Sequence, residues 1–482
     1  MKPKPRKTKP TNTPPANDDT HSRRAFLSGC AKGIGGVAVA GLAAPSLLAT
    51  PAEASRQAAA PVVGEYDVVV CGGGPAGFIA AVAAARGGAR TALVERYGFL
   101  GGMATAGLVS PISVFNLNGR RVIGGTPWEF IEKLSAIGGA GVDLPRGNVT
   151  FCPEKYKLVA QRMVIDAGVT LYLHSYLTDC RQNGRALSHV VIENKNGAQT
   201  LAAKYFIDCT GDADLALRAG VPMQPAPENL QPASLIFMLG NVDTDAIPPN
   251  RLRHGLPGSQ DTDFRAILQK LSKTQKIPLF GGPWYNSTLA KGVVVVNITR
   301  TAANMADNRE ATEAECLLRE DVHTFVDLLR KHAPAFRDAT LLTTATQTGI
   351  RETRRILGAH TLTGDEYLAA TKFPDTIARG CHPVDIHSSN SARQRAEYLK
   401  QPGNVPYRCL HSPGFPNLLV AGRPFSGDEV ASASVRVQAS AMCLGQAAGA
   451  AAALCLADNR DVSQVNIGRL RETLIQSGAI LD

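Results

Sequence analysis

Residues 65–95, EYDVVVCGGGPAGFIAAVAAARGGARTALVE, decide the fold of this chain. The apolar run 66–71 ends on glycines and predicts a buried parallel strand. Residues 75–86 are rich in alanine and predict a helix with proline in its first turn, and residues 91–94 predict a second strand that ends on Glu95. Between the first strand and the helix, Gly72, Gly74 and Gly77 form the pattern G-x-G-x-x-G.

This order of strand, glycines, helix, strand and acid favours a dinucleotide site over a merely glycine-rich turn. One glycine makes the turn, one lets the backbone approach a pyrophosphate, and one lets helix and strand pack closely. The helix N-terminus offers free amides and a partial positive charge to phosphates. Glu95 is placed where a carboxylate can accept hydrogen bonds from ribose hydroxyls.

The length and composition are those of a globular protein with two or three domains: 482 residues, 44% hydrophobic and 19% charged. Residues 1–54 contain eight basic and three acidic residues, so without them the formal net charge falls from +10 to +5. The remaining positive charge is diffuse and is not interleaved with aromatic residues, which predicts no nucleic-acid partner.

The first 54 residues predict an export signal. Residues 1–21 are rich in Lys, Pro and Thr and are expected to be disordered. A twin-arginine pair at Arg23 and Arg24 precedes the weakly apolar run 33–48 and the small residues 52–54, which predicts a twin-arginine signal peptide and a periplasmic or exported protein. The apolar run contains Pro45 and is too short for a full span, so we expect no permanent membrane anchor. The twin-arginine export machinery moves folded proteins, which suits a chain that binds its cofactor before export.

The ten cysteines predict neither a disulfide framework nor a metal site. Cys30 lies in the signal, and the other nine are an odd number without a C-x-x-C motif; several lie in apolar runs typical of core residues. Cys381, His382 and His387 are close in sequence, but no second group of ligands with zinc spacing accompanies them.

The rest of the chain predicts an α/β protein in several parts. After the glycine-punctuated loop 96–105, helices are expected at 127–134 and 153–167. Strands are expected at 169–174, 176–180, 187–193 and 201–208, with tight turns at Asn183-Gly184 and Asn196-Gly197. These strands predict an antiparallel β-meander inserted into a Rossmann-like parallel sheet. The domain boundaries are then 65–220 for the first part of the dinucleotide-binding domain, 221–340 for a substrate or cap domain, 341–460 for a return to the first domain, and 461–482 for a C-terminal helix.

Two regions of the later chain are less regular. Residues 221–260 are rich in Pro, Asn and Gln and predict a boundary, followed by helices at 263–272 and 310–331 and a strand at 292–298. The strand 417–423 precedes a long Ala/Gly-rich helix at 434–457. Hydropathy makes this helix resemble a membrane span, but polar residues interrupt it, and Gly445 and Gly449 predict close packing on a neighbouring element.

Several ordered motifs resemble the FAD-dependent oxidoreductase family of the glutathione-reductase-like flavoprotein superfamily. The motifs are GGGPAG at 72–77, Glu95, GGMAT at 101–105, DCTGDAD at 208–214, GIRETRRILG at 349–358, KFPDTIARGCHPVDIH at 372–387, VPYRCL at 405–410, and the segments NLLVAGR, SVRV and GQAAGAAAAL between 417 and 454. Family members often carry histidine where this chain has Glu429, a residue that we expect to be a solvated loop acid.

The resemblance implies bound FAD and a set of residues that hold it. Those expected near the pyrophosphate and ribose are Gly72, Gly74, Pro75, Ala76, Gly77, Glu95 and Arg96. Those expected on the flavin side or along the flank of the dinucleotide are Gly101, Gly102, Met103, Thr210, Gly211, Gly422, Arg423, Ser434, Val435 and Arg436. The N-terminus of the last long helix would stabilise negative charge on reduced flavin.

The candidates for substrate chemistry are His387, Asp385 and Arg351. His387 and Asp385 are possible proton carriers in a polar loop, although a structural role for His387 is an equal alternative. Arg351, Arg354 and Arg355 can clamp a carboxylate or phosphate, or else form an ion-pair network with Glu352.

The favoured function is an exported FAD-dependent oxidoreductase that transfers a hydride between a small-molecule substrate and flavin, with an electron partner that the sequence does not identify. One alternative is an NAD-retaining enzyme of non-redox or self-contained redox chemistry, such as glycoside cleavage. The other is a non-catalytic protein that has kept the fold. Export disfavours freely exchanging NAD, and the intact phosphate glycines disfavour the non-catalytic reading.

Overall fold

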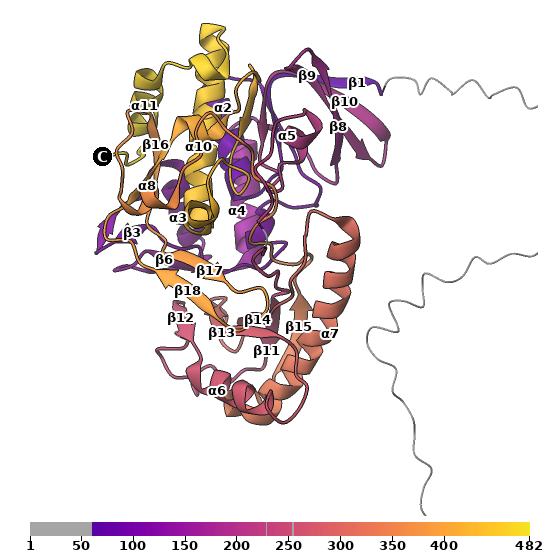
Figure 1. Cartoon of the computed structure of the whole chain (residues 1–482), viewed down its shortest axis with the longest axis vertical. Coiled ribbons are helices and arrows are strands. Elements are labelled where there is room, and N and C mark those ends of the chain that lie inside the picture. Colours follow the sequence, from indigo (N-terminus) through magenta and orange to yellow (C-terminus); the bar gives the residue numbers. More distant parts are fainter. Residues whose placement is uncertain (1–59, 228, 253–254) are drawn as a thin grey trace, which may run out of the picture. The chain divides into compact units, whose positions relative to one another are not determined.

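The structure is a computed structural model that describes residues 60–227, 229–252 and 255–482. The expected tail and twin-arginine signal at 1–54 lie outside the described residues. Residues from Ala59 to Asp482 group as one compact unit built on two β-sheets. The mixed α/β class expected from the sequence is confirmed, and Figure 1 shows the order of its elements.

The first sheet carries the glycine motif. Its parallel part has the order β7 (Thr170–Tyr172), β2 (Thr91–Val94), β1 (Val62–Cys71), β10 (Gly197–Asp208) and β20 (Leu418–Val420). Val68, Val69 and Val70 in β1 have no exposed surface, because helices and strands cover both faces of the sheet. The β1 strand and the following helix α2 (Pro75–Arg86) begin and end close to the positions that the sequence predicted.

Strand β10 has two partners along one edge. Its first half pairs antiparallel with β9 (Ala186–Asn194), which pairs antiparallel with β8 (Tyr176–Asn183), and its last three residues pair parallel with β20. Gly184 and Gly197 have positive φ at the two turns, the conformation that tight hairpin turns require. The carboxyl ends of β1 and β10 therefore remain side by side, and the motifs that follow both strands meet there.

Helices pack on this sheet through small residues. Helix α10 (Gln438–Asp458) lies along α2, and a Cβ added at Gly445 or Gly449 would come within 2.0 or 2.2 Å of a carbonyl oxygen of α2. The close packing expected from these glycines is confirmed. Within the described part of the chain, α10 is the one helix long and apolar enough to span a membrane, and 83% of its apolar window is buried in the protein.

One predicted helix boundary is wrong. The expected single helix at 434–457 is two helices, α9 (Glu429–Val435) and α10, which are separated at Arg436 and Val437. Val437 is extended, with φ −68° and ψ 155°, so the second helix begins with its own free amides at Gln438. Composition alone does not reveal this break, because serine, valine and alanine continue across it.

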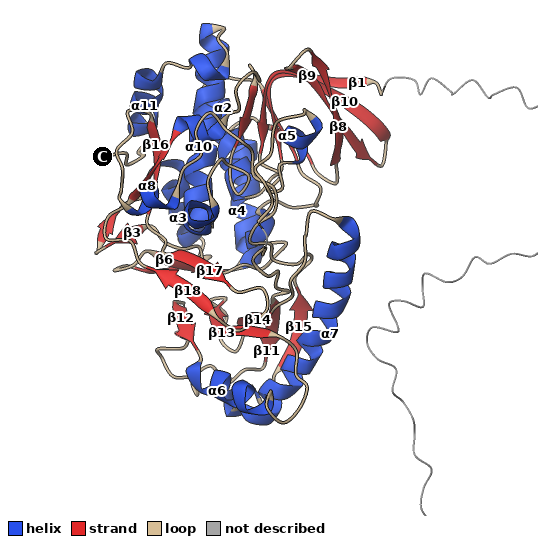
Figure 2. Ribbon diagram, viewed as in Figure 1, coloured by secondary structure: helices blue, strands red, loops and turns tan. Residues whose placement is uncertain are grey.

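The second sheet is antiparallel, with the order β12 (Pro257–Gln260), β13 (Phe280–Ser287), β14 (Val294–Thr299), β11 (Phe237–Gly240) and β15 (Thr340–Thr344). Helix α7 (Asn308–His332) buries Leu318, Val322 and Phe325 against it, and α6 (Thr262–Leu271) packs at β13. Figure 2 shows α6 and α7 beside these strands. The sequence reading missed β11, β13 and β15; β11 and β12 lie within the stretch that was interpreted as a boundary.

The remaining described α-helices and strands complete the fold. They are β3 (Asn116–Leu117), β4 (Arg120–Arg121), α3 (Gly125–Ala136), β5 (Ala140–Asp143), β6 (Asn148–Phe151), α4 (Pro153–Asp166), α5 (Asp214–Arg218), α8 (Gly364–Leu368), β16 (Thr376–Gly380), β17 (Val384–His387), β18 (Gln394–Glu397), β19 (Gly403–Pro406) and α11 (Ile467–Gln476). The hairpin of β17 and β18 contributes to the site, because its first strand carries Asp385 and His387.

Candidate functional site

The three motif glycines have three different physical roles. Gly72 has φ +98°, and a Cβ there would lie 2.4 Å from the carbonyl oxygen of Cys209, so Gly72 makes the turn beside β10. A Cβ at Gly77 would lie 1.7 Å from the carbonyl oxygen of Gly72, so Gly77 allows α2 to pack on the strand end. A Cβ at Gly74 would meet only Gly102, at 3.8 Å, which leaves the space in front of Gly74 open.

The first turn of α2 presents free amides to a cavity. Gly74 is the N-cap, no side chain caps the helix, and Pro75 has no amide hydrogen. Gly74, Pro75 and Ala76 all line the cavity, so the positive end of the helix dipole is directed at it. A helix N-terminus of this kind binds phosphate groups.

Glu95 is buried beside this loop. Its Oε2 accepts a hydrogen bond from the Gly73 amide at 2.7 Å, and its Oε1 accepts one from the Tyr97 amide at 2.9 Å. Burial raises the pKa of the Glu95 carboxyl, and the two amides oppose that rise. The side chain thus holds the glycine loop in place, and its oxygens keep lone pairs for a ligand hydroxyl.

Two cavities meet at the glycine loop. The first has a volume of about 380 Å³ and the second about 660 Å³. Both are lined by Gly72, Glu95, Arg96, Tyr97, Thr210, Asp212, Gln347 and Ile350. An extended dinucleotide with its pyrophosphate at the glycines needs space on both sides of them, and this arrangement provides it.

Most of the residues expected to bind the cofactor come together in the first cavity. They are Gly72, Gly74, Pro75, Ala76, Glu95, Arg96, Gly102, Met103, Thr210, Gly211, Gly422, Arg423 and Arg436. Gly77 and Gly101 lie behind the lining and shape the backbone. Ser434 and Val435 are buried in α9, where the Ser434 hydroxyl hydrogen-bonds to the carbonyl oxygen of His382, and they do not line the cavity.

The turn after β10 is fixed by two aspartates. Asp208 accepts hydrogen bonds from the Thr210 amide and hydroxyl and from the Ala216 amide, and burial raises its pKa to about 6. Asp212 Oδ1 accepts from Arg423 Nη2 at 2.7 Å and from the Thr353 hydroxyl at 2.7 Å. This pairing holds Arg423 across the turn at the cavity wall.

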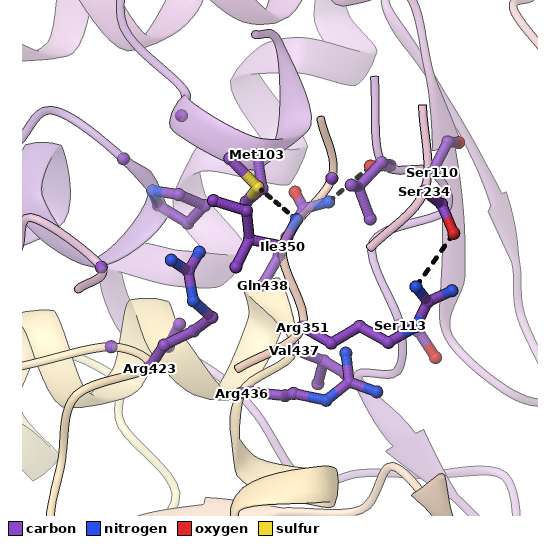
Figure 3. Close-up of a pocket in the computed structure, with 18 of the residues that line it drawn as sticks. Met103, Ser110, Ser113, Ser234, Ile350, Arg351, Arg423, Arg436, Val437 and Gln438 are labelled. Atoms are coloured by element: carbon purple, nitrogen blue, oxygen red, sulfur yellow. Dashed lines mark hydrogen bonds between the residues drawn. The ribbon is translucent and has the colours of Figure 1, made fainter. Parts of the chain in front are cut away.

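Several residues that line the first cavity carry buried polar atoms without a protein partner. Among the described residues these include Ser110 Oγ, Arg423 Nε, Arg436 Nε and Gln438 Oε1, and all four residues line the cavity. Figure 3 shows Gln438, the first residue of α10, beside Ile350 and Met103, and the Arg436 side chain directed toward Arg351. Unpartnered buried polar atoms are costly, so a polar ligand is needed here, and the donors, acceptors and paired cavities fit FAD.

His387 is held by two partners. Arg300 Nη2 lies 2.6 Å from His387 Nδ1, and Asp385 Oδ2 lies 2.9 Å from His387 Nε2. A guanidinium only donates, so Nδ1 accepts and Nε2 carries the hydrogen that is donated to Asp385. Burial and the neighbouring arginines lower the pKa of His387 to about 3. His387 is therefore neutral, and both its ring nitrogens are occupied.

His382 lines the same cavity and is held differently. Its Nδ1 lies 2.7 Å from the carbonyl oxygen of Pro383, so Nδ1 carries the hydrogen and Nε2 carries an unshared pair. No partner for Nε2 is present in the described part of the chain. Burial lowers the pKa of His382 to about 4.

The structure separates the three arginines of the GIRETRRILG motif. Arg351 lines the first cavity and donates through Nη1 to the carbonyl oxygen of Pro232 and to the Ser234 hydroxyl. Arg354 pairs with Asp214 at 3.3 Å beside the second cavity, and Arg355 pairs with the buried Glu352 at 3.2 Å. Only Arg351 lies near His387 and Asp385.

Glu429 is the first residue of α9 and does not line either cavity. Its side chain is partly exposed, and partial burial together with Glu352 raises its pKa. This position agrees with an acid that takes no part in the lining.

Sequence reasoning missed several lining residues from the second sheet. Ser234 precedes β11, while Trp284 and Asn286 lie on β13 and Asn297 lies on β14. Trp284 packs edge-on against the His387 ring, with centroids 5.8 Å apart. No local motif marks these residues, because they reach the site only through the pairing of distant strands.

Comparison with known proteins agrees with this geometry. Residues 67–474 match the family model for FAD dependent oxidoreductase. A 42-residue segment is 57% identical to dihydrolipoyl dehydrogenase of Trypanosoma brucei brucei, and the match covers 9% of each protein. The chain thus matches less than a tenth of the length of that curated relative.

Solved structures are similar at low identity. A geranylgeranyl bacteriochlorophyll reductase-like protein of Thermoplasma acidophilum is 15% identical, with 86% of this chain and 84% of that chain covered and a TM-score of 0.46. A p-nitrophenol 4-monooxygenase of Pseudomonas putida is 12% identical, with coverage of 86% and 84% and a TM-score of 0.41. TM-scores of this size carry no inference about chemistry. The family match spans most of the chain, however, and this protein belongs to the FAD dependent oxidoreductase family, an enzyme with FAD as its cofactor.

Proposed function

We propose that this enzyme transfers a hydride between a small organic substrate and bound FAD at the far end of the first cavity. The observation that supports this proposal is one continuous lining, which runs from the glycine loop to Asp385, His387 and Arg351. Bound FAD supplies two-electron chemistry at its ring system. The cavity must also hold the flavin ring within about 380 Å³, so the substrate is small.

The proposed cofactor contacts follow from where each group lies. Gly72, Gly74 and the amides of the first turn of α2 bind the pyrophosphate, and Glu95 binds the adenosine ribose. The start of α10, at Gln438, directs its positive end toward the flavin ring, a role that the sequence interpretation gave to a helix start four residues earlier. Arg96 and Tyr97 both donate to the Gln347 side chain, which closes the wall between the two cavities.

The proposed substrate wall comes from the second sheet. Ser234, Trp284 and Asn286 face the cavity from β13 and from the segment before β11. We assign residues 221–340 as the substrate or cap domain on this basis, and the β8–β9–β10 meander as an insertion in the cofactor domain. Neither assignment changes which residues line the cavity.

The proton that accompanies the hydride has two possible carriers. The sequence prediction gave it to His387 and Asp385, but the His387 ring already donates to Asp385 and accepts from Arg300. We assign the proton to His382 Nε2, with Asp385 and His387 positioning the arginines. Replacement by glutamine separates the assignments. Because neutral His382 accepts the proton, His382→Gln removes the acidic limb of the pH–rate profile, while His387→Gln only lowers its height. If instead His387→Gln removes that limb and His382→Gln only lowers the height, His387 carries the proton.

Export by the twin-arginine pathway is proposed from the sequence. A cofactor bound before translocation would travel inside the folded protein. Replacement of Arg23 and Arg24 by lysine should retain FAD-loaded protein in the cytoplasm, measured by cell fractionation. Unchanged distribution of the double variant would contradict the proposal.

Hydride transfer is tested with the FAD-loaded full chain. Under anaerobic conditions the bound flavin, which absorbs near roughly 370 and 450 nm, should be bleached by a suitable organic donor, and the reduced form should be reoxidised by an acceptor. A panel of small donors and acceptors identifies the direction of electron flow. Retention of flavin without bleaching or reoxidation by any organic compound, although dithionite reduces it, would contradict hydride exchange with such substrates.

A further inference from the structure

Three arginines gather around the far end of the first cavity: Arg351 and Arg436 line it, and Arg300 lies behind His387. Arg300 is 2% exposed and Arg351 is 9% exposed. Arg300 is linked to Asp385 through His387, which lies between them. Arg436 Nη2 lies 3.8 Å from Asp385 Oδ2. Asp385 is the one carboxylate that lines this end of the cavity among the described residues. The end of the cavity therefore carries an excess of positive charge.

The three guanidinium groups differ in what they have left to donate. Arg300 is occupied, because Nη1 donates to the carbonyl oxygens of Ser391 and Arg393 and Nη2 donates to His387. Arg351 uses only Nη1, and no hydrogen bond from its Nη2 occurs in the described part of the chain. Arg436 donates through Nη2 to the carbonyl oxygen of Asp385, while its buried Nε has no partner.

Arg351 and Arg436 line the same space. Figure 3 shows their guanidinium groups beside Ser113 and Ser234 in the cavity. Burial, and then the charge of Arg436, are the main causes that lower the pKa of Arg351, to about 9. Like charges held together away from water are stabilised by an anion between them.

We propose that Arg351 and Arg436 bind a carboxylate of the substrate, so that the substrate is a small organic acid. This inference rests on the proposed function, because it names the substrate class of the same cavity. A guanidinium presents a planar fork of donors that matches two carboxylate oxygens. The hydroxyls of Ser113 and Ser234 lie within the same lining.

The rest of the lining fits the body of such an acid. Trp284 and Ile236 offer aromatic and aliphatic surface next to the arginines, and Asn286 is held by a hydrogen bond from its Nδ2 to the Ser110 carbonyl oxygen. The Trp284 ring is fixed against His387. The carboxylate end of the ligand is therefore paired with charge, while its carbon skeleton contacts apolar walls.

The test is a spectral titration of the FAD-loaded full chain. Benzoate and succinate are compared with their uncharged isosteres benzamide and succinamide, and the perturbation of the flavin absorbance gives each dissociation constant without turnover. We expect the carboxylates to bind at least tenfold more tightly than the amides. Equal affinity for the amides would overturn the proposal.

Variants locate the binding site. Arg351→Gln should weaken carboxylate binding at least tenfold while FAD is retained, and Arg351→Lys should give an intermediate loss because charge remains but the fork is lost. Arg309→Gln is the control; it removes the same charge from a side chain that is 88% exposed on α7, and it should leave the affinity unchanged. Wild-type carboxylate affinity in Arg351→Gln would overturn the assignment, and if that variant does not fold, the lysine variant decides.

Three further outcomes separate this inference from competing explanations. If Arg436→Gln loses FAD or lowers the flavin potential while carboxylate affinity is unchanged, the arginines serve the flavin and the proposal is wrong. Inorganic phosphate is the competing probe, and tighter binding of phosphate than of either carboxylate would overturn the choice of a carboxylate. If carboxylates bind as expected but no donor or acceptor exchanges electrons with the flavin, hydride transfer fails and this inference stands.

Discussion

The glycine loop and the arginine cluster face one cavity, yet they are built in opposite ways. The loop consists of backbone atoms from a few consecutive residues, and a Cβ at Gly72 or Gly77 would overlap a carbonyl oxygen. The cluster consists of long side chains, and Arg300 and His387 are 87 residues apart in sequence. The glycine loop depends on the absence of side chains at its glycines. The arginine cluster depends on the charge balance between segments that are distant in sequence.

The largest expected effect comes from adding one methyl group to the loop. Gly77→Ala places a Cβ 1.7 Å from the Gly72 carbonyl oxygen, so α2 must move off the strand end and the cooperative fold should be lost or weakened by several kcal/mol. Gly74→Ala meets no protein atom closer than 3.8 Å and should fold normally, but its methyl group occupies the phosphate space. We expect folded, colourless protein from Gly74→Ala, by circular dichroism and absorbance. Equal stability of the two variants would contradict this division of roles.

The same contrast explains what the sequence predicted. The unit of β1, α2 and β2 was predicted because turn, helix cap and packing are all encoded within 31 consecutive residues, 65–95. The wall formed by Trp284, Ser234 and Asn286 was not predicted. Arg351 and Ser234 are 117 residues apart, and they meet beside the isolated bridge that pairs Ser234 with Gly349. The sequence pattern of neither segment predicts that contact.

The break before α10 was missed for a related reason. Residues on both sides of it have similar composition, and Val437 is extended although valine tolerates a helix. Arg436 at the break directs its charge into the cavity and bonds to the Asp385 backbone. The tertiary contact thus outweighs the local helix preference at the point where the proposed flavin contact uses free amides.

The second prediction concerns Arg355, which was a candidate anion-binding residue and does not line either cavity. Arg355 and Glu352 are 6% and 3% exposed, and Glu352 also accepts from the Gln231 amide at 2.7 Å. Glu352→Ala leaves a buried charge and a buried amide unpaired, and should lower the free energy of unfolding by about 3–5 kcal/mol. Carboxylate affinity should not change. Chemical denaturation and the flavin titration measure both, and a selective loss of carboxylate binding would place this pair in the site.

The third prediction concerns the charge balance of the cluster itself. Asp385→Asn keeps the shape of the side chain but removes the negative charge beside Arg436. It also leaves one oxygen for the two donors, His387 Nε2 and Gln394 Nε2, that the two carboxylate oxygens accept from. We expect carboxylate binding to tighten severalfold, because the competing anion is gone. Turnover should fall roughly 10²-fold, because the His387 ring no longer has a fixed orientation. Weaker carboxylate binding in this variant would show that Asp385 holds the arginines in place more than it competes with the ligand.

The smallest expected effect concerns stability and pH. As pH falls, the free energy of unfolding should change in opposite directions through groups at the glycine loop and groups at the arginine cluster. At the loop end, burial raises the pKa of Asp208 to about 6, so its protonation stabilises the folded protein as pH falls through 6. At the cluster end, His382 and His387 have pKa values lowered to about 4 and about 3, so the unfolded chain binds more protons below 6.5 and stability is lost as pH falls. The two histidines outweigh Asp208, and these three groups together should contribute a net loss of about 2 kcal/mol between pH 7 and 5.5. Denaturant titration at the two pH values measures it. His387→Gln should make the free energy of unfolding less dependent on pH, whatever the stability of the variant at pH 7. If the pH dependence of this variant equals that of the wild type, His387 is not neutral in the folded protein.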